Sequence, residues 1–125
     1  MNRRRVSVAL AVLGLCAGCM TIEAGKPVAP ERLEARLKIG ESTARDVRQV
    51  LGPPAGKGSA LLPIHDGPRT VWAYYYEYSN VFATKFLRYG RTYLWIYLDG
   101  DKYDGYMWFS SLPDDVRRRK GAQTP

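Results

Sequence analysis

The spacing of apolar side chains changes near residue 70, and the two halves of the chain predict different kinds of element. Between residues 30 and 52, apolar positions recur every three or four residues, which is the spacing of one helical face. After residue 70, aromatic and β-branched residues become dense, as they do in strands. We therefore expect an α+β fold in which short helices precede a sheet.

The first helix is expected to begin at Pro30, because the first helical position needs no backbone amide donor. Leu33 and Leu37 are four residues apart and form a short apolar face that runs to about Lys38. Gly40 then ends the helix, since glycine readily adopts the left-handed conformation that follows many helix ends. A helix this short is not stable alone and must cover another surface.

A second helix is expected directly afterwards. Ser42 and Thr43 are both good N-terminal caps, and the spacing from Thr43 to Asp46 is that of a capping box. Gly52 and Pro53 stop this helix. Its apolar side chains fall on one face, and they are Ala44, Val47, Val50 and Leu51.

Three strands are predicted at residues 70–79, 92–98 and 101–110, with the hairpin signal Asp99-Gly100 between the last two. Alternation within the second strand places Leu94, Ile96 and Leu98 on one face and Tyr93, Trp95 and Tyr97 on the other. The pattern thus predicts two short N-terminal helices packed on one face of a three-stranded antiparallel β-sheet.

The remaining segments are expected to be irregular. Residues 19–30 contain glycine and proline with few apolar groups and predict a tether, and residues 55–69 predict a long loop. The connection at 80–91 is unusually apolar. Residues 31–112 therefore form the folded domain, and residues 113–125 are a flexible basic tail.

The chain begins with the layout of an export signal. Residues 1–5 include three arginines, residues 6–15 are uncharged and apolar, and small side chains lead up to Cys19. Ten apolar residues are too few to span a hydrocarbon layer of about 30 Å. The Ala17-Gly18-Cys19 sequence resembles the lipobox of bacterial lipoproteins, in which the signal (here residues 1–18) is cut off and the cysteine is acylated. The alternative is an ordinary secreted protein that is cut after Gly18 and carries no lipid.

Composition limits the function of the exported part. Removal of residues 1–18 leaves 107 of the 125 residues, with sixteen basic and twelve acidic side chains and a net charge of +4. The basic residues are scattered and the chain is exported, so we expect no nucleic-acid partner. Cys16 would be discarded with the signal and Cys19 used for lipidation, which leaves no disulfide. The sequence predicts no cofactor.

The ordered set of motifs resembles the SmpA/OmlA (BamE-like) family of outer-membrane lipoproteins. The matching segments are Ile39-Gly40-Glu41-Ser42-Thr43 with Asp46-Val47, Leu51-Gly52-Pro53-Pro54, Trp72 with Tyr74, and Leu94 to Gly100. The resemblance covers about residues 31 to 109 and implies the same helices-on-sheet fold. Within it, we interpret Gly40, Ser42, Thr43, Val47, Leu51, Gly52 and Pro53 as residues that specify the fold rather than perform chemistry.

The lipoprotein signal also indicates a place in the cell. The second residue after the cleavage point is Met20. An aspartate at this position would resemble the signal that retains lipoproteins in the inner membrane, and this chain lacks it. We therefore expect a protein anchored to the outer membrane by lipid on Cys19, with its domain in the periplasm. The family implies envelope proteins as partners, among them the β-barrel assembly machinery.

Candidate catalytic chemistry is sparse. The single histidine, His65, neighbours Asp66 in the long loop, but adjacent loop residues rarely converge, and we expect a solvated side chain. Asp99, Asp101 and Asp104 lack the rest of a calcium-binding loop and suit a hairpin turn. The sequence predicts no enzyme, no metal site and no small-molecule substrate.

The excess of aromatic residues suggests a binding surface. The chain has nine tyrosines and three tryptophans, more than a thin core can bury. Long side chains and loops covering the second sheet face are the alternative explanation. The candidate partner-binding residues are Tyr93, Trp95, Tyr97, Phe82 and Phe86.

Three functions remain open from sequence. The first is a non-enzymatic outer-membrane lipoprotein with a periplasmic protein-binding domain, accessory to β-barrel assembly. The second is a structural or stress-related envelope lipoprotein outside that machinery, and the third is an inhibitor-like binder.

Overall fold

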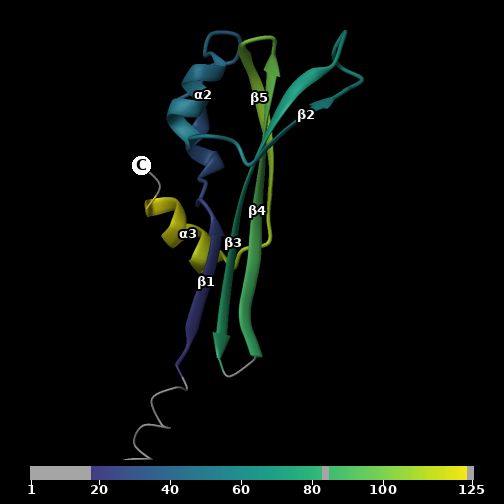
Figure 1. The fold of residues 1–125 in the computed structure, drawn as a ribbon. Coiled ribbons are helices and arrows are strands. Elements are labelled where there is room, and N and C mark those ends of the chain that lie inside the picture. Colours follow the sequence, from purple (N-terminus) through teal and green to yellow (C-terminus); the bar gives the residue numbers. More distant parts are fainter. Residues whose placement is uncertain (1–17, 83–84, 124–125) are drawn as a thin grey trace, which may run out of the picture.

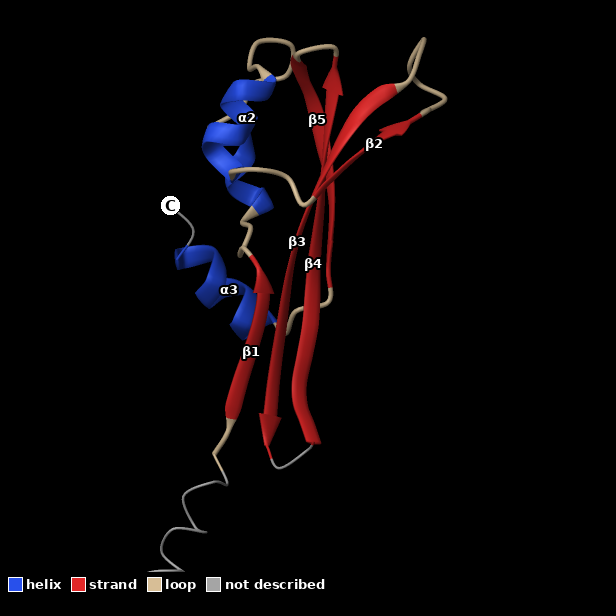
Figure 2. Ribbon diagram, viewed as in Figure 1, coloured by secondary structure: helices blue, strands red, loops and turns tan. Residues whose placement is uncertain are grey.

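The computed structural model describes residues 18–82 and 85–123, which form one antiparallel sheet with its helices on a single side (Figures 1 and 2). Two long strands, β3 (Arg69–Phe82) and β4 (Lys85–Asp99), pair along their whole length at its centre. β5 (Lys102–Ser110) pairs with the outer edge of β4. β1 (Met20–Gly25) and β2 (Gly56–Ala60) lie end to end along the other edge of β3.

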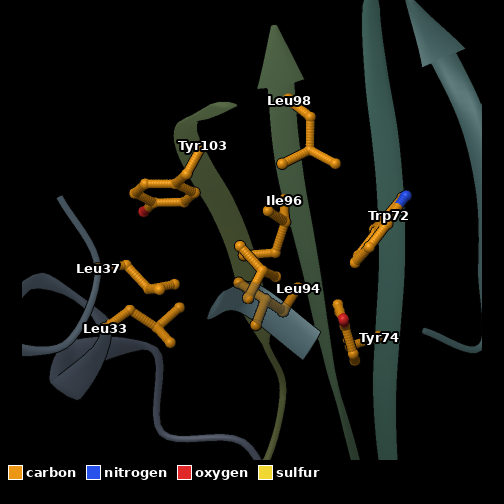
Figure 3. Packing of buried hydrophobic residues seen from close by; sticks show 9 residues of the cluster. Leu33, Leu37, Trp72, Tyr74, Leu94, Ile96, Leu98 and Tyr103 are labelled. Atoms are coloured by element: carbon orange, nitrogen blue, oxygen red, sulfur yellow. The ribbon is translucent and has the colours of Figure 1, made fainter. Parts of the chain in front are cut away.

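The core lies between the sheet and the helices. Leu94, Ile96 and Leu98 on β4 are buried, with Trp72 and Tyr74 on β3 beside them, and Figure 3 shows these side chains directed toward the helical layer. Leu33, Leu37, Val47 and Tyr103 complete this cluster. The alternation predicted for residues 92–98 is therefore observed, and Leu94, Ile96 and Leu98 form the face that packs against the helices.

Helix α2 (Ala44–Leu51) begins as the sequence indicates. The Thr43 amide donates to Asp46 Oδ2 at 2.7 Å, and the Asp46 amide donates to Thr43 Oγ1 at 3.3 Å, which makes a reciprocal capping box. Val47 is fully buried against the sheet.

The other residues of the sequence motif surround this helix. Ser42 Oγ accepts from the Lys38 amide, and the Tyr74 hydroxyl donates to the Gly52 carbonyl at 3.1 Å. Gly40 and Gly52 have φ values of 77° and 80°, which favour glycine. Leu51 is half-buried against the core, and Pro53 is exposed just after the helix. All seven motif residues therefore lie in or around the helical layer.

The predicted fold class is wrong in its sheet and in its helices. The sheet has five strands rather than three, because the expected tether forms β1 and part of the expected loop forms β2. The first expected helix is a 3-10 helix, Pro30–Ala35, in place of a longer α-helix. A further helix, α3 (Asp114–Gln123), occupies the segment expected to be a flexible tail.

Helix α3 has its own small core at the lower half of the sheet. Val116 is fully buried and packs with Tyr76, Tyr78 and Leu112. The chain reaches this position by passing close to Gly90, where a Cβ atom would lie 2.6 Å from Leu112 Cα. Lys120 on α3 also forms an ion pair with Glu23 on β1 at 2.6 Å. The C-terminal segment is thus a structural part of the covered face.

Candidate functional site

The sheet face opposite the helices carries a continuous row of aromatic and aliphatic side chains. Strand register places Tyr75 opposite Tyr93 and Tyr93 opposite Phe109, and it places Trp95 between Ala73 and Met107. Figure 2 shows that the described helices all lie on the other side of the sheet. We call this surface the open face, and its residues are Val71, Ala73, Tyr75, Tyr93, Trp95, Tyr97, Met107 and Phe109.

Exposure on the open face is substantial. Tyr75, Met107 and Phe109 have 40%, 51% and 57% of their surface exposed. Tyr93, Trp95 and Tyr97 are half-buried by their neighbours on the same face. The rings of Tyr93 and Trp95 stack with centroids 5.8 Å apart and an interplanar angle of 14°, an arrangement that is favourable between aromatic side chains.

A shallow hollow of ≈ 420 Å³ lies beside this row, between β2 and β4. It exists because β2 contributes only small groups to this side of the sheet, namely Gly56, Gly58 and Ala60. Trp95, Tyr97 and Met107 form the opposite wall. The hollow has the lining that would accept one or two apolar side chains of another molecule.

An ion pair between Arg91 and Glu77 lies at the border of the open face. Arg91 Nε donates to Glu77 Oε2 at 3.0 Å, and the guanidinium lies 5.2 Å from the centre of the Tyr89 ring. The hydrogen bond to the Tyr93 hydroxyl and then that to Glu77 raise the pKa of Arg91. The arginine is therefore held in place as a cation by groups of its own sheet.

A second hollow, of ≈ 380 Å³, lies at the edge of β3 in the gap between β1 and β2. Leu51 and Val28 line it from the helical side and Tyr74 from the sheet. Lys26 is the single charged residue among those that line it, so it holds no acid–base pair.

His65 is not the solvated side chain expected from the sequence. Its Nε2 lies 3.7 Å from Asp104 Oδ2, and its Nδ1 lies 3.3 Å from an Arg69 guanidinium nitrogen. Arg69 Nε donates to Asp104 at 2.8 Å and also faces Asp99. Asp104 is the extra residue at a bulge in β5. These contacts attach the 61–68 loop to the sheet, and the described residues contain no cluster suited to hold a metal ion.

The structure separates the five candidate partner-binding residues into two groups. Tyr93, Trp95 and Tyr97 share the open face, whereas Phe82 is exposed at the far end of β3. Phe86 is paired with Val81 in β4, and its side chain lies outside what the structure describes.

Sequence analysis missed Tyr75, Met107 and Phe109 as members of the open face. These three residues alternate with inward-facing residues in the same way as Tyr93 and Trp95 do. They could have been found by pairing the neighbouring strands with β4, because Tyr75 and Phe109 lie opposite Tyr93, and Met107 lies opposite Trp95.

The candidate lipidation site, Cys19, is an exposed free cysteine directly before β1. The rest of the expected signal, residues 1–17, lies outside the described residues. None of the described helices is both long and apolar enough to cross a membrane.

Comparison with known proteins gives no relative. No family model, no curated protein and no solved structure matches this chain. The resemblance to the SmpA/OmlA family therefore stays a prediction from the sequence.

Proposed function

We propose that this protein is a lipid-anchored, non-enzymatic adaptor of the bacterial envelope that binds another protein through the open face. The observation that carries the proposal is the asymmetry of the sheet, since helices cover one face and leave aromatic side chains exposed on the other. An apolar sheet face of this kind is costly to leave in water.

The chemistry of the open face favours a protein partner. Tyrosine, tryptophan, phenylalanine and methionine are enriched at protein interfaces, and their rings bring large contact area with few rotatable bonds. The surface is shallow, and the one ion pair described at its border, Arg91 with Glu77, is already formed within the sheet. A partner would therefore bury apolar area and place a side chain in the hollow beside Trp95, where Lys57 is the one charged residue of the lining.

The anchor in this proposal is Cys19, which would carry the lipid after removal of residues 1–18. Met20 at the next position favours the outer membrane, with the domain in the periplasm. Within the envelope, the resemblance makes the β-barrel assembly machinery the candidate partner. The alternative is a partner outside that machinery.

Site-specific photo-crosslinking tests the proposal in living cells. A photoreactive amino acid is placed at Met107 or Phe109 on the open face, and at Arg118, an exposed residue of α3, as the control. We expect the two open-face positions to capture one common envelope protein that Arg118 does not capture. Capture of the same proteins from all three positions contradicts the proposal, as does a crosslink only to a second copy of this chain.

Mass spectrometry then identifies the crosslinked protein. A subunit of the barrel-assembly machinery would place this adaptor in outer-membrane protein assembly, and another envelope protein would place it elsewhere. The intact mass of the purified protein reports separately whether Cys19 carries acyl chains.

A further inference from the structure

The segment that follows the proposed lipid anchor is part of the sheet. β1 starts at Met20, one residue after Cys19, and pairs in register with β3 from Met20–Val81 to Gly25–Tyr76. No slack chain therefore separates the anchor from the folded domain. The same register, extended by one residue, sets Cys19 opposite Phe82.

Three strands meet at this end of the molecule. β3 ends at Phe82, β4 begins at Lys85, and β1 begins on the other side of β3 from β4, as Figure 1 shows at the lower end of the sheet. We call this end the anchor end and define it by Met20, Ile22, Val81 and Phe82. Any surface that holds the lipid of Cys19 lies within a residue or two of these side chains.

The anchor end is apolar and exposed. Met20, Ile22 and Phe82 have 57%, 47% and 41% of their surface exposed. Residues 79–90 contain Lys85 and Arg88 but no acidic residue, and residues 19–22 carry no charged side chain. Arg88 is paired with Asp115 of α3, so its charge is already neutralised within the domain. No carboxylate in these segments would oppose contact with an anionic bilayer.

We propose that the anchor end inserts into the bilayer interface and holds the sheet upright on the membrane. This inference rests on the proposed lipidation of Cys19. The acyl chains bring Phe82 and Met20 to the headgroup region, where burial of their exposed surface is favourable. The open face then stands at a fixed height, because β1 connects it rigidly to the anchor.

Environment-sensitive labels measure this orientation. Lipidation blocks the thiol of Cys19, so a cysteine introduced by Phe82→Cys is the single reactive thiol of the purified lipoprotein. Met107→Cys is the matched control, since Met107 is exposed to a similar extent (51% against 41% for Phe82) but pairs with Trp95, nine residues along β4 from Phe86. At about 3.4 Å per residue this separation is about 30 Å. Ile22→Cys supplies a second anchor-end position.

Each labelled protein is reconstituted in vesicles of phosphatidylethanolamine and phosphatidylglycerol. We expect the label at position 82 or 22 to shift to shorter emission wavelength and to become several-fold less accessible to iodide, while the label at 107 stays as accessible as in detergent-free buffer. Full iodide access at positions 82 and 22 overturns the inference, and so does equal protection at all three positions, which means that the sheet lies flat.

The intact mass of the protein in the same preparations distinguishes a failure of the proposed lipid anchoring from a failure of the proposed orientation. Protein without acyl chains contradicts the proposed anchoring itself. Acylated protein whose anchor-end labels stay in water leaves the anchor standing and overturns the inserted, upright orientation.

Discussion

Trp95 and Ile96 are neighbours on β4 and face opposite sides of the sheet. Ile96 is fully buried in the core, whereas Trp95 is half-buried beside the hollow of the open face. A large side chain can thus contribute to stability at one position and be available to a partner at the next. The two residues provide a direct comparison of the two roles.

We expect Ile96→Ala to lower the free energy of unfolding by about 2–5 kcal/mol, because it leaves a cavity in a closed core. Trp95→Ala should cost less stability, since its ring has packing on one side only, and should abolish partner capture. Thermal melting and crosslinking from Phe109 measure the two effects in both variants. Equal loss of melting temperature in the two variants would mean that both faces are core.

Residue-level patterns could predict one strand of the site but not its neighbours. Leucine and isoleucine alternate with aromatic residues at 93–98, so the two faces of β4 differ in kind. On β3, both alternating rows contain aromatic residues. One row consists of Trp72, Tyr74, Tyr76 and Tyr78, and the other contains Tyr75. Which row joins the open face depends on pairing with β4, which lies some twenty residues away in sequence.

At the scale of elements, prediction succeeded where local chemistry decides. Helix α2 has a capping box, an apolar stripe and a Gly-Pro stop, all within eleven residues. β2 has none of these signals, because Gly56-Lys57-Gly58-Ser59-Ala60 lacks β-branched and aromatic residues. It is a strand because the edge of β3 offers backbone partners, and that edge is not visible from the local sequence.

Long-range pairing also explains the other missed elements. The apolar connection at 80–91 continues β3 and β4, so that Val81 and Phe86 pair across the hairpin. β1 forms from the expected tether because its backbone pairs with β3 more than fifty residues later. Helix α3 is highly polar, and its one buried side chain, Val116, gave no periodic signal.

Helix α3 gives a prediction at this scale. We expect Val116→Asp to destabilise the domain strongly, since it places an unpaired charge among Tyr76, Tyr78 and Leu112. Arg118→Asp introduces the same residue at an exposed position of the same helix and should change the melting temperature little. A melting temperature for Val116→Asp equal to that of Arg118→Asp would show that α3 does not contribute to the core.

Three carboxylates stabilise the molecule as a whole. Glu23 and Asp115 form ion pairs between segments that are distant in sequence, and Asp46 caps the N-terminus of α2. The Lys120 ammonium holds the pKa of Glu23 below its ordinary value, and the Arg88 guanidinium does the same for Asp115. Backbone and hydroxyl hydrogen bonds from Thr43 lower the pKa of Asp46. Each group therefore binds a proton less readily in the folded state than in the unfolded chain.

The sign of the pH dependence follows. The stabilisation is fully present above the ordinary values, 4.5 for glutamate and 3.8 for aspartate, and it is lost as the pH falls through and below them. We expect the melting temperature to change little between pH 7 and 5 and to fall toward pH 3, and the part of the fall due to these groups is modest because they lie at the surface, where solvent screens them. Asp115→Asn should make the decrease of melting temperature with falling pH less steep. An unchanged decrease in this variant would exclude the ion pair between Arg88 and Asp115 as a cause of the pH dependence.

The position of β1 also decides how the domain resists mechanical tension. If lipid holds Cys19 while a bound partner moves away from the membrane, the load runs along the axis of β1. Hydrogen bonds in an antiparallel pair are perpendicular to the strands, so the bonds along Met20–Gly25 would be sheared together instead of broken in turn. A force perpendicular to the strand would instead break the pairs one at a time. If Cys19 carries lipid as proposed, the pairing of β1 with β3 thus makes the attachment strongest against tension between the lipid and a bound partner.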